Sequence, residues 1–86
     1  IETEDTPNPH ALKFNVALAE PGAAPRSYRD IASARAADDA LAVALFNAGP
    51  VVGVLILPAF VTVSKTPAAR WSRLRPRIET VLEAAR

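Results

Sequence analysis

The stretch 51–65 constrains the fold of this chain most strongly, because two β-rich runs flank a short break. The first run covers residues 51–57 and the second covers 60–65, with Pro58 and Ala59 between them. β-Branched and aromatic residues favour strands, and a short proline-bearing break between two such runs is typical of an antiparallel hairpin. We therefore expect a mainly antiparallel sheet that contains this hairpin.

The two faces of the hairpin carry different groups of side chains, because side chains alternate along a strand. With a connection of two or four residues, one face carries Val54, Ile56, Val61 and Val63. The other face carries Leu55, Leu57, Phe60 and Thr62. If helices cover the first face, the second is an uncovered apolar cluster. It is then either a surface for a partner or a second copy, or a set of scattered surface hydrophobes.

Two prolines one residue apart precede another predicted strand. They lie in the run Thr6, Pro7, Asn8 and Pro9. Each proline fixes φ and moves the residue before it toward extended geometry. Leu12, Phe14 and Val16 then alternate with polar residues, which predicts a strand with one buried face. The run 6–9 is therefore expected to be a stiff, non-helical lead into this strand.

Residues 38–46 are predicted to form a helix, with leucines one turn apart on its buried side. Asp38 is the expected N-cap, because a carboxylate there can accept the free amide hydrogens of the first turn. Gly49 followed by a proline is a stop signal. The alanine-rich stretch 32–37 either extends this helix or forms a separate turn.

A second helix closes the chain, and its apolar residues recur at spacings of three and four. They are Trp71, Leu74, Ile78 and Leu82. Ser72 is the expected N-cap, which puts Pro76 in the fourth helical position. A proline there removes only about the first intrahelical hydrogen bond, so we expect the helix to continue with a mild bend.

A short second strand is expected at 27–29, after a loop at 20–25, and is expected to pair with the first strand in a hairpin. The predicted order is then ββαββα. This order is typical of an α+β fold, here a mainly antiparallel sheet with two helices packed on one face. At 86 residues the chain is expected to be a single domain, 1–86.

The charges of the chain are nearly balanced, with a formal net charge of +1. Nucleic-acid-binding domains usually carry a clear positive excess, so no nucleic-acid partner is expected. The last helix is nevertheless basic, and its arginines include Arg70, Arg73 and Arg77. A solvated outer face is the simpler interpretation of this stripe, and an anion site at these three arginines is the alternative.

The chain contains no cysteine, so it offers no thiolate to zinc or to an iron–sulfur cluster, and we expect neither a cofactor nor a resident metal. Four residues close in sequence carry side chains that can ligate iron weakly: Glu2, Glu4, Asp5 and His10. A histidine in a proline-rich loop near a chain end is ordinarily solvated, which is the favoured interpretation. No serine lies in a Gly-x-Ser-x-Gly context and no glycine-rich loop is present, so no catalytic residue and no enzymatic activity are predicted.

The longest apolar stretch, 51–57, is too short to span a bilayer, and the acidic N-terminal end lacks the pattern of a signal peptide. The lack of cysteine agrees with a reducing compartment. We therefore expect no membrane segment and a cytoplasmic location.

Four pieces of the sequence resemble, in order, the N-terminal domain of the Nfu/NifU-type iron–sulfur scaffold proteins. The first is Thr-Pro-Asn-Pro at 6–9, followed by Ala-Leu-Lys-Phe at 11–14. The second is Leu-Phe at 45–46, and the third is the hairpin that ends in Phe-Val-Thr-Val-Ser-Lys at 60–65. The fourth, at 71–78, looks like the Trp-x-x-Leu-x-Pro-x-Ile helix of the family. Together these pieces extend over nearly the whole chain.

The resemblance implies an accessory role in the assembly of iron–sulfur clusters or in their delivery to client proteins. In this family the domain commonly precedes a second domain with a Cys-x-x-Cys pair, which holds the cluster. This chain has no cysteine, so it is either a piece of a longer protein or a free-standing copy that acts by binding other proteins, and the free-standing copy is favoured. The expected partners are iron–sulfur assembly factors or apo-client proteins.

Two places in the sequence are candidate contact sites for such partners. One is the run 6–9, and the other is the hairpin face with Leu55, Leu57 and Phe60. The alternative hypothesis is a small regulatory or ligand-binding module unrelated to clusters, in which a homodimer forms across the open face of the sheet.

Overall fold

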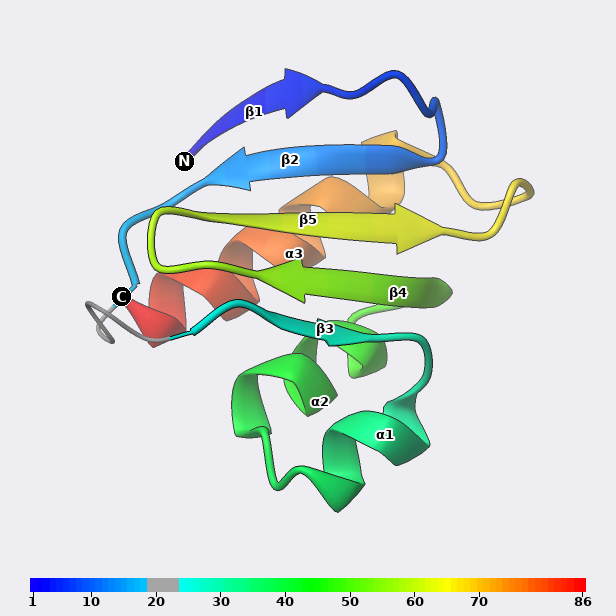
Figure 1. Cartoon of the computed structure of the whole chain (residues 1–86). Coiled ribbons are helices and arrows are strands. Elements are labelled where there is room, and N and C mark those ends of the chain that lie inside the picture. The colour runs from blue at the N-terminus through cyan, green and yellow to red at the C-terminus, as the bar shows by residue number, and fades with distance from the viewer. Residues whose placement is uncertain (19–23) are drawn as a thin grey trace.

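The computed structural model describes residues 1–18 and 24–86, which form five strands and three helices (Figure 1). The strands are β1 (Glu2–Asp5), β2 (Ala11–Asn15), β3 (Arg26–Tyr28), β4 (Val51–Ile56) and β5 (Phe60–Lys65). The helices are α1 (Ile31–Ala36), α2 (Ala40–Asn47) and α3 (Trp71–Ala85). The loop expected at 20–25 lies largely outside the described residues.

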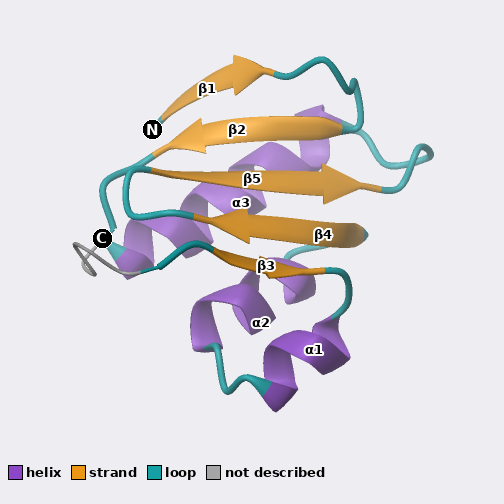
Figure 2. Cartoon of the chain, viewed as in Figure 1, coloured by secondary structure: helices purple, strands orange, loops and turns teal. Residues whose placement is uncertain are grey.

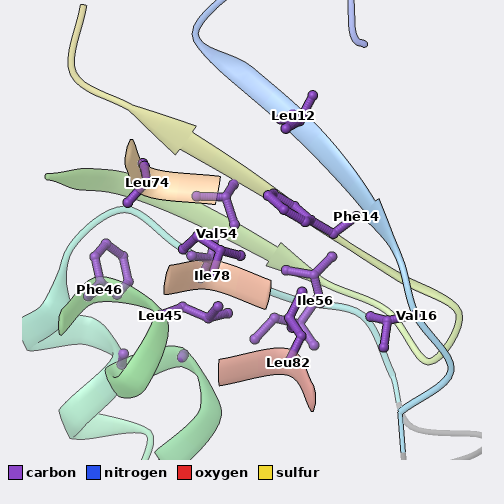
Figure 3. Close-up of a cluster of buried hydrophobic side chains, with 14 residues drawn as sticks. Leu12, Phe14, Val16, Leu45, Phe46, Val54, Ile56, Leu74, Ile78 and Leu82 are labelled. Atoms are coloured by element: carbon purple, nitrogen blue, oxygen red, sulfur yellow. The ribbon is translucent and has the colours of Figure 1, made fainter. Parts of the chain in front are cut away.

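All of these strands join one antiparallel sheet in the order β1-β2-β5-β4-β3. The helices lie on one side of it: α3 crosses behind the central strands, and α2 and α1 lie near β4 and β3 (Figure 2). Buried side chains from the sheet and the helices meet in one cluster, for example Phe14 and Ile56 with Leu45 and Ile78 (Figure 3). The predicted α+β fold is therefore confirmed, with one more strand and one more helix than expected.

β4 and β5 form the predicted hairpin in the predicted register. Its inward pairs are Val54 with Val63 and Ile56 with Val61, and all four side chains are buried. A hydrogen bond from Leu57 N to Phe60 O, at 2.9 Å, closes the connection. The ladder is interrupted by a bulge at Val52, which the alternation pattern did not predict.

The two edge strands of the sheet differ from the prediction. β1 was not predicted, because its residues, Glu-Thr-Glu-Asp, show no apolar alternation. This strand pairs with β2, and Thr3 lies opposite Phe14. Charged residues on an edge strand also disfavour pairing with other chains. The strand expected at 27–29 exists as β3, but its predicted pairing with the first strand was wrong. β3 lies at the far edge beside β4, with Ser27 opposite Leu55.

α1 and α2 are separate helices, which decides between the two interpretations of the stretch 32–37. Asp30 caps α1, and the hydrogen bond that its carboxylate accepts from Ser33 N, at 2.7 Å, lowers the pKa of Asp30. Asp39, not Asp38, caps α2, by accepting from a backbone N–H of its first turn at 3.2 Å. The predicted cap was wrong because Asp38 adopts a left-handed φ of 54°, which aspartate tolerates, and so belongs to the turn between the helices.

α3 begins at Trp71, two residues before the prediction. Its N-cap is Arg70, which makes no side-chain cap hydrogen bond, so the prediction of Ser72 as the cap was wrong. Pro76 is therefore the sixth helical residue and removes the bond that an N–H there would donate to the carbonyl of Ser72. The helix continues to Ala85 because its apolar stripe is buried against the sheet. In residues 1–18 and 24–86, no helix is long and apolar enough to cross a membrane.

Candidate functional site

The run 6–9 forms a compact turn between β1 and β2, which we call the proline loop. The Oγ1 atom of Thr6 lies 2.8 Å from the carbonyl oxygen of Asn8 and 3.0 Å from that of Ala11, and it accepts a hydrogen bond from Asn8 N at 3.2 Å. The side chain of Asn8 in turn accepts from His10 N at 2.9 Å. Such side-chain-to-backbone bonds stabilise turns, so the loop is held in one shape while both of its prolines are exposed.

Trp71 connects the proline loop to α3. Its indole Nε1 donates a hydrogen bond to Pro9 O at 3.2 Å, and its ring meets the ring of Phe14 edge-on, with centroids 6.3 Å apart. The ring, the loop and the end of β1 line a hollow of about 380 Å³. The helical stripe indicated only a core position for Trp71, but its side chain is half-buried and forms part of this candidate site.

Lys65 lies beside Trp71 and is only 6% exposed. Its Nζ lies 5.7 Å from the centroid of the Trp71 ring and donates to Thr66 O at 3.3 Å, while its backbone N donates to His10 O at 2.8 Å. His10 Nδ1 is buried and has no hydrogen-bond partner in the described part of the chain. The expectation of a solvated His10 was therefore wrong for this nitrogen. Pro9 anchors the loop to α3, and His10, directly after it, anchors the chain to β5.

The four residues considered as weak iron ligands form no metal site in the described structure. Glu4 instead pairs with Lys13, with 3.4 Å between Oε2 and Nζ. Within residues 1–18 and 24–86, no group of three or more histidine, aspartate or glutamate side chains is placed to hold a metal ion.

The outer face is the side of the sheet opposite the helices. The large apolar side chains that are exposed in the described residues are Val52, at 47%, and Leu55, at 36%. Both line a shallow hollow of about 260 Å³, together with Gly53, Thr62 and Ser64. The bulge in β4 therefore adds Val52 to the face on which the hairpin pattern placed Leu55.

Phe60 and Leu57, which were predicted to share the face of Leu55, are half-buried. The ammonium group of Lys13 lies 4.4 Å from the centroid of the Phe60 ring. This cation–π contact covers part of the ring. The apolar cluster on the outer face is therefore smaller than predicted and centres on Leu55 and Val52.

The arginine hollow is a cavity of about 580 Å³ beside the first two turns of α3. It is lined by Arg70, Arg73 and Arg77, together with Pro50, Ala68, Ala69 and Leu74. The three arginines are spaced by three and four residues, so they lie along one side of the helix. The structure thus brings together all three residues of the predicted anion site, and it adds an apolar floor that the sequence stripe did not indicate.

Asp39 joins β3 to α2 through a cluster that the sequence analysis did not find. Its Oδ2 accepts from the hydroxyl of Tyr28 at 2.9 Å and lies 3.0 Å from Arg26 Nε, while Oδ1 caps α2. Burial, together with the Asp39 carboxylate, raises the pKa of Tyr28. We assign this cluster to stability, because it fixes β3 at the edge of the sheet beside β4.

Comparison with known proteins matches nearly the whole chain to one family. Residues 1–85 match the family described as "Scaffold protein Nfu/NifU N terminal". Over 82 residues the chain is 37% identical to the mitochondrial NFU1 iron–sulfur cluster scaffold homologue of Drosophila erecta and 35% identical to that of Drosophila sechellia. Each alignment covers 95% of this chain but 29% of the relative, so the chain spans less than a third of these curated relatives.

Two solved structures have the same fold. The solution structure of a NifU-like protein from Saccharomyces cerevisiae gives a TM-score of 0.80 at 25% identity, and the match covers 96% of this chain and 74% of that chain. The crystal structure of a Staphylococcus aureus protein gives a TM-score of 0.74 at 21% identity, and the match covers 94% of each chain.

Proposed function

This chain belongs to the family of Nfu/NifU scaffold N-terminal domains, and we propose that it serves as a non-catalytic accessory domain in iron–sulfur cluster assembly or delivery. The curated relatives are named as cluster scaffolds, and the chain corresponds to 29% of their length. Because its 86 residues include no cysteine, the proposal assigns no cluster ligand to this chain. The chain acts by protein–protein contact, its partners are assembly factors or apo-client proteins, and any contact with iron is weak.

The exposure of Leu55 beside Val52 on the outer face is the observation that carries this proposal. The helices lie against the opposite face of the sheet (Figure 2), and Val52 and Leu55 stay exposed. Burying apolar surface lowers the free energy by about 25 cal/mol per Å². A partner that covers these two side chains would therefore gain binding free energy. Ser27, Thr62 and Ser64 line the same hollow, so the surface has the apolar centre and polar surroundings of a protein interface.

The proline loop is the second contact region in this proposal. It is already held in one shape by Thr6, Asn8 and Trp71, so little conformational entropy is lost when a partner binds to it. The exposed rings of Pro7 and Pro9 stand beside the hollow that the indole lines. This loop can therefore present a rigid apolar edge to a partner.

On the outer face, a ligand-binding site has less support than a protein-binding one. The hollow on the outer face, about 260 Å³, is smaller than the about 300–1,000 Å³ of usual small-molecule sites. A homodimer across this face stays a prediction. The cytoplasmic location also stays a prediction, and the curated relatives are named as mitochondrial.

The test is affinity capture of iron–sulfur assembly proteins by the immobilised chain, quantified by mass spectrometry. The variant Leu55→Gln with Phe60→Gln removes apolar surface from the outer face without changing charge. We expect assembly factors and apo-client proteins to be enriched on the unchanged chain and lost from this variant. The control is Ala32→Gln, which makes a similar exposed change on α1, on the other side of the sheet.

Two results decide the proposal. Thermal unfolding followed by circular dichroism must first show that the variant is folded. If the folded variant still captures the same proteins, the outer face is not their binding surface. If no iron–sulfur protein is enriched even by the unchanged chain, the accessory role itself is contradicted.

A further inference from the structure

Among the described residues, the arginines that line the arginine hollow have no acidic partner, unlike Arg75 and Arg86. Arg75 and Arg86 each form an ion pair with a glutamate of the same helix, at 3.1 Å and 3.0 Å. Arg70, Arg73 and Arg77 form no ion pair within residues 1–18 and 24–86. All three are exposed, and all three border the same cavity of about 580 Å³. Their charges are therefore available to a ligand.

The position of these charges is unfavourable in the isolated chain. Arg70 and Arg73 lie at the N-terminal end of α3, where the helix dipole is positive and acidic residues are normally preferred. The first turn of α3 contains no acidic residue, and its N-cap makes no side-chain hydrogen bond. Arg73 N donates to the carbonyl oxygen of Arg70 at 3.1 Å, but within the described residues no side chain caps the amide hydrogens of Trp71 and Ser72. A bound anion would offset both the repulsion among the arginines and the missing cap.

The floor of the arginine hollow is held in place by close packing. Leu74, which forms part of its floor, is 3% exposed. A Cβ atom added at Gly49 would lie 2.6 Å from Leu74 Cδ1, so the turn before β4 approaches α3 closely only because residue 49 is glycine. Pro50, which follows it, belongs to the same floor. The floor of the cavity is therefore preformed.

From these observations we infer that the arginine hollow binds an acidic segment of a partner protein, in which carboxylates meet the arginines and an apolar side chain lies against Leu74. Charge complementarity sets the sign of the ligand, and the apolar floor of Pro50, Ala68, Ala69 and Leu74 favours a peptide over a bare inorganic anion. No aromatic residue lines the cavity, and the net charge is only +1, so the stacking platform and the broad positive field of a nucleic-acid site are missing. This site is distinct from the outer face, and its chemistry does not depend on the proposed iron–sulfur role.

The test uses the whole 86-residue chain and a fluorescein-labelled peptide, Glu-Glu-Leu-Leu-Glu-Glu, with anisotropy measured at low and at physiological salt. The variant Arg73→Gln with Arg77→Gln removes two charges from the cavity. The matched control, Arg75→Gln with Arg86→Gln, removes two charges outside the cavity, one within α3 and one at its C-cap. We expect the first variant to weaken binding by about fivefold or more, since two charge-assisted contacts are lost, and the control to leave binding within about twofold.

Several outcomes would overturn the inference. One is an unchanged chain that does not bind the peptide at low salt. Another is an equal loss of binding in the two double variants, because binding would then follow net charge alone. Equal affinity for the neutral peptide Gln-Gln-Leu-Leu-Gln-Gln, or tighter binding of a single-stranded oligonucleotide than of the acidic peptide, would also contradict it. All four arginines are exposed, so the variants are expected to fold, and circular dichroism checks this.

Discussion

The indole Nε1 of Trp71 donates a hydrogen bond to the carbonyl oxygen of Pro9 at 3.2 Å, across 62 residues of sequence. The bond joins the proline loop to the first turn of α3, and both segments belong to the pieces by which the chain resembles its family. Arg70 directly precedes Trp71, so the same turn also borders the arginine hollow. Two of the three candidate surfaces therefore meet at the start of α3.

The first prediction concerns this hydrogen bond. Trp71→Phe keeps an aromatic ring beside Phe14 but removes the donor to Pro9. We expect the free energy of unfolding to fall by about 1 kcal/mol, the usual net value of one hydrogen bond, together with some loss of packing. Urea unfolding followed by circular dichroism measures the loss. Amide hydrogen exchange should accelerate at His10 and Ala11 but not in α1; unchanged exchange in the loop would show that Trp71 does not hold it.

The second prediction separates two neighbouring aspartates. Asp39→Asn keeps a capping oxygen but removes the charge that faces Arg26 and Tyr28, so we expect a loss of about 1 to 2 kcal/mol in urea unfolding. Asp38→Asn is the matched control. Asparagine also tolerates the left-handed conformation of this position, so the change should stay within about 0.5 kcal/mol. Equal losses in the two variants would contradict the assignment of the cap and of the cluster to Asp39.

The third prediction follows from the raised pKa of Tyr28, which burial causes first and the hydrogen bond to Asp39 second. The usual value is 10.0, so above pH 10 the unfolded chain loses this proton more readily than the folded one. Tyr28 therefore contributes stability that is fully present below pH 10 and is lost as the pH rises through its folded pKa. Tyr28→Phe should remove this component, so its stability should fall less steeply above pH 10 than that of the unchanged chain. Parallel pH profiles of thermal unfolding in the two proteins would contradict this contribution of Tyr28 to the pH dependence of stability.

Local patterns predicted the hairpin and most of the core, because both depend on periodicity within one segment. The inward pairs of the hairpin and the stripe of α3 with Leu74, Ile78 and Leu82 are buried as expected. β1 escaped prediction because an acidic edge strand is held by backbone pairing with β2, and its side chains carry no apolar signal. The pairing partner of β3 was predicted wrongly, because strands that are neighbours in the sequence often pair. In the structure the Asp39 cluster holds β3 near α2 instead.

The candidate site was less predictable than the fold, because each part of it combines segments that are distant in sequence. The arginine stripe was visible, but its floor comes partly from Pro50, which precedes β4. Trp71 looked like a core residue, since only the folded chain shows that its indole reaches Pro9. The bulge that exposes Val52 has no signal in the alternation of apolar residues, which instead pointed to Phe60 and Leu57.

The fourth prediction tests the close approach of Gly49 to α3. In Gly49→Ala the new Cβ would lie 2.6 Å from Leu74 Cδ1, and Leu74 is buried, so it has little room to move. We expect a loss of about 1 to 3 kcal/mol from overpacking in urea unfolding. Gly53→Ala is the matched control, because its nearest contact would be an ordinary 3.6 Å from Tyr28 O, and alanine suits a strand better than glycine does. If Gly49→Ala is as stable as Gly53→Ala, the turn is not held against the helix, and the floor of the arginine hollow is not fixed in the way that the cavity requires.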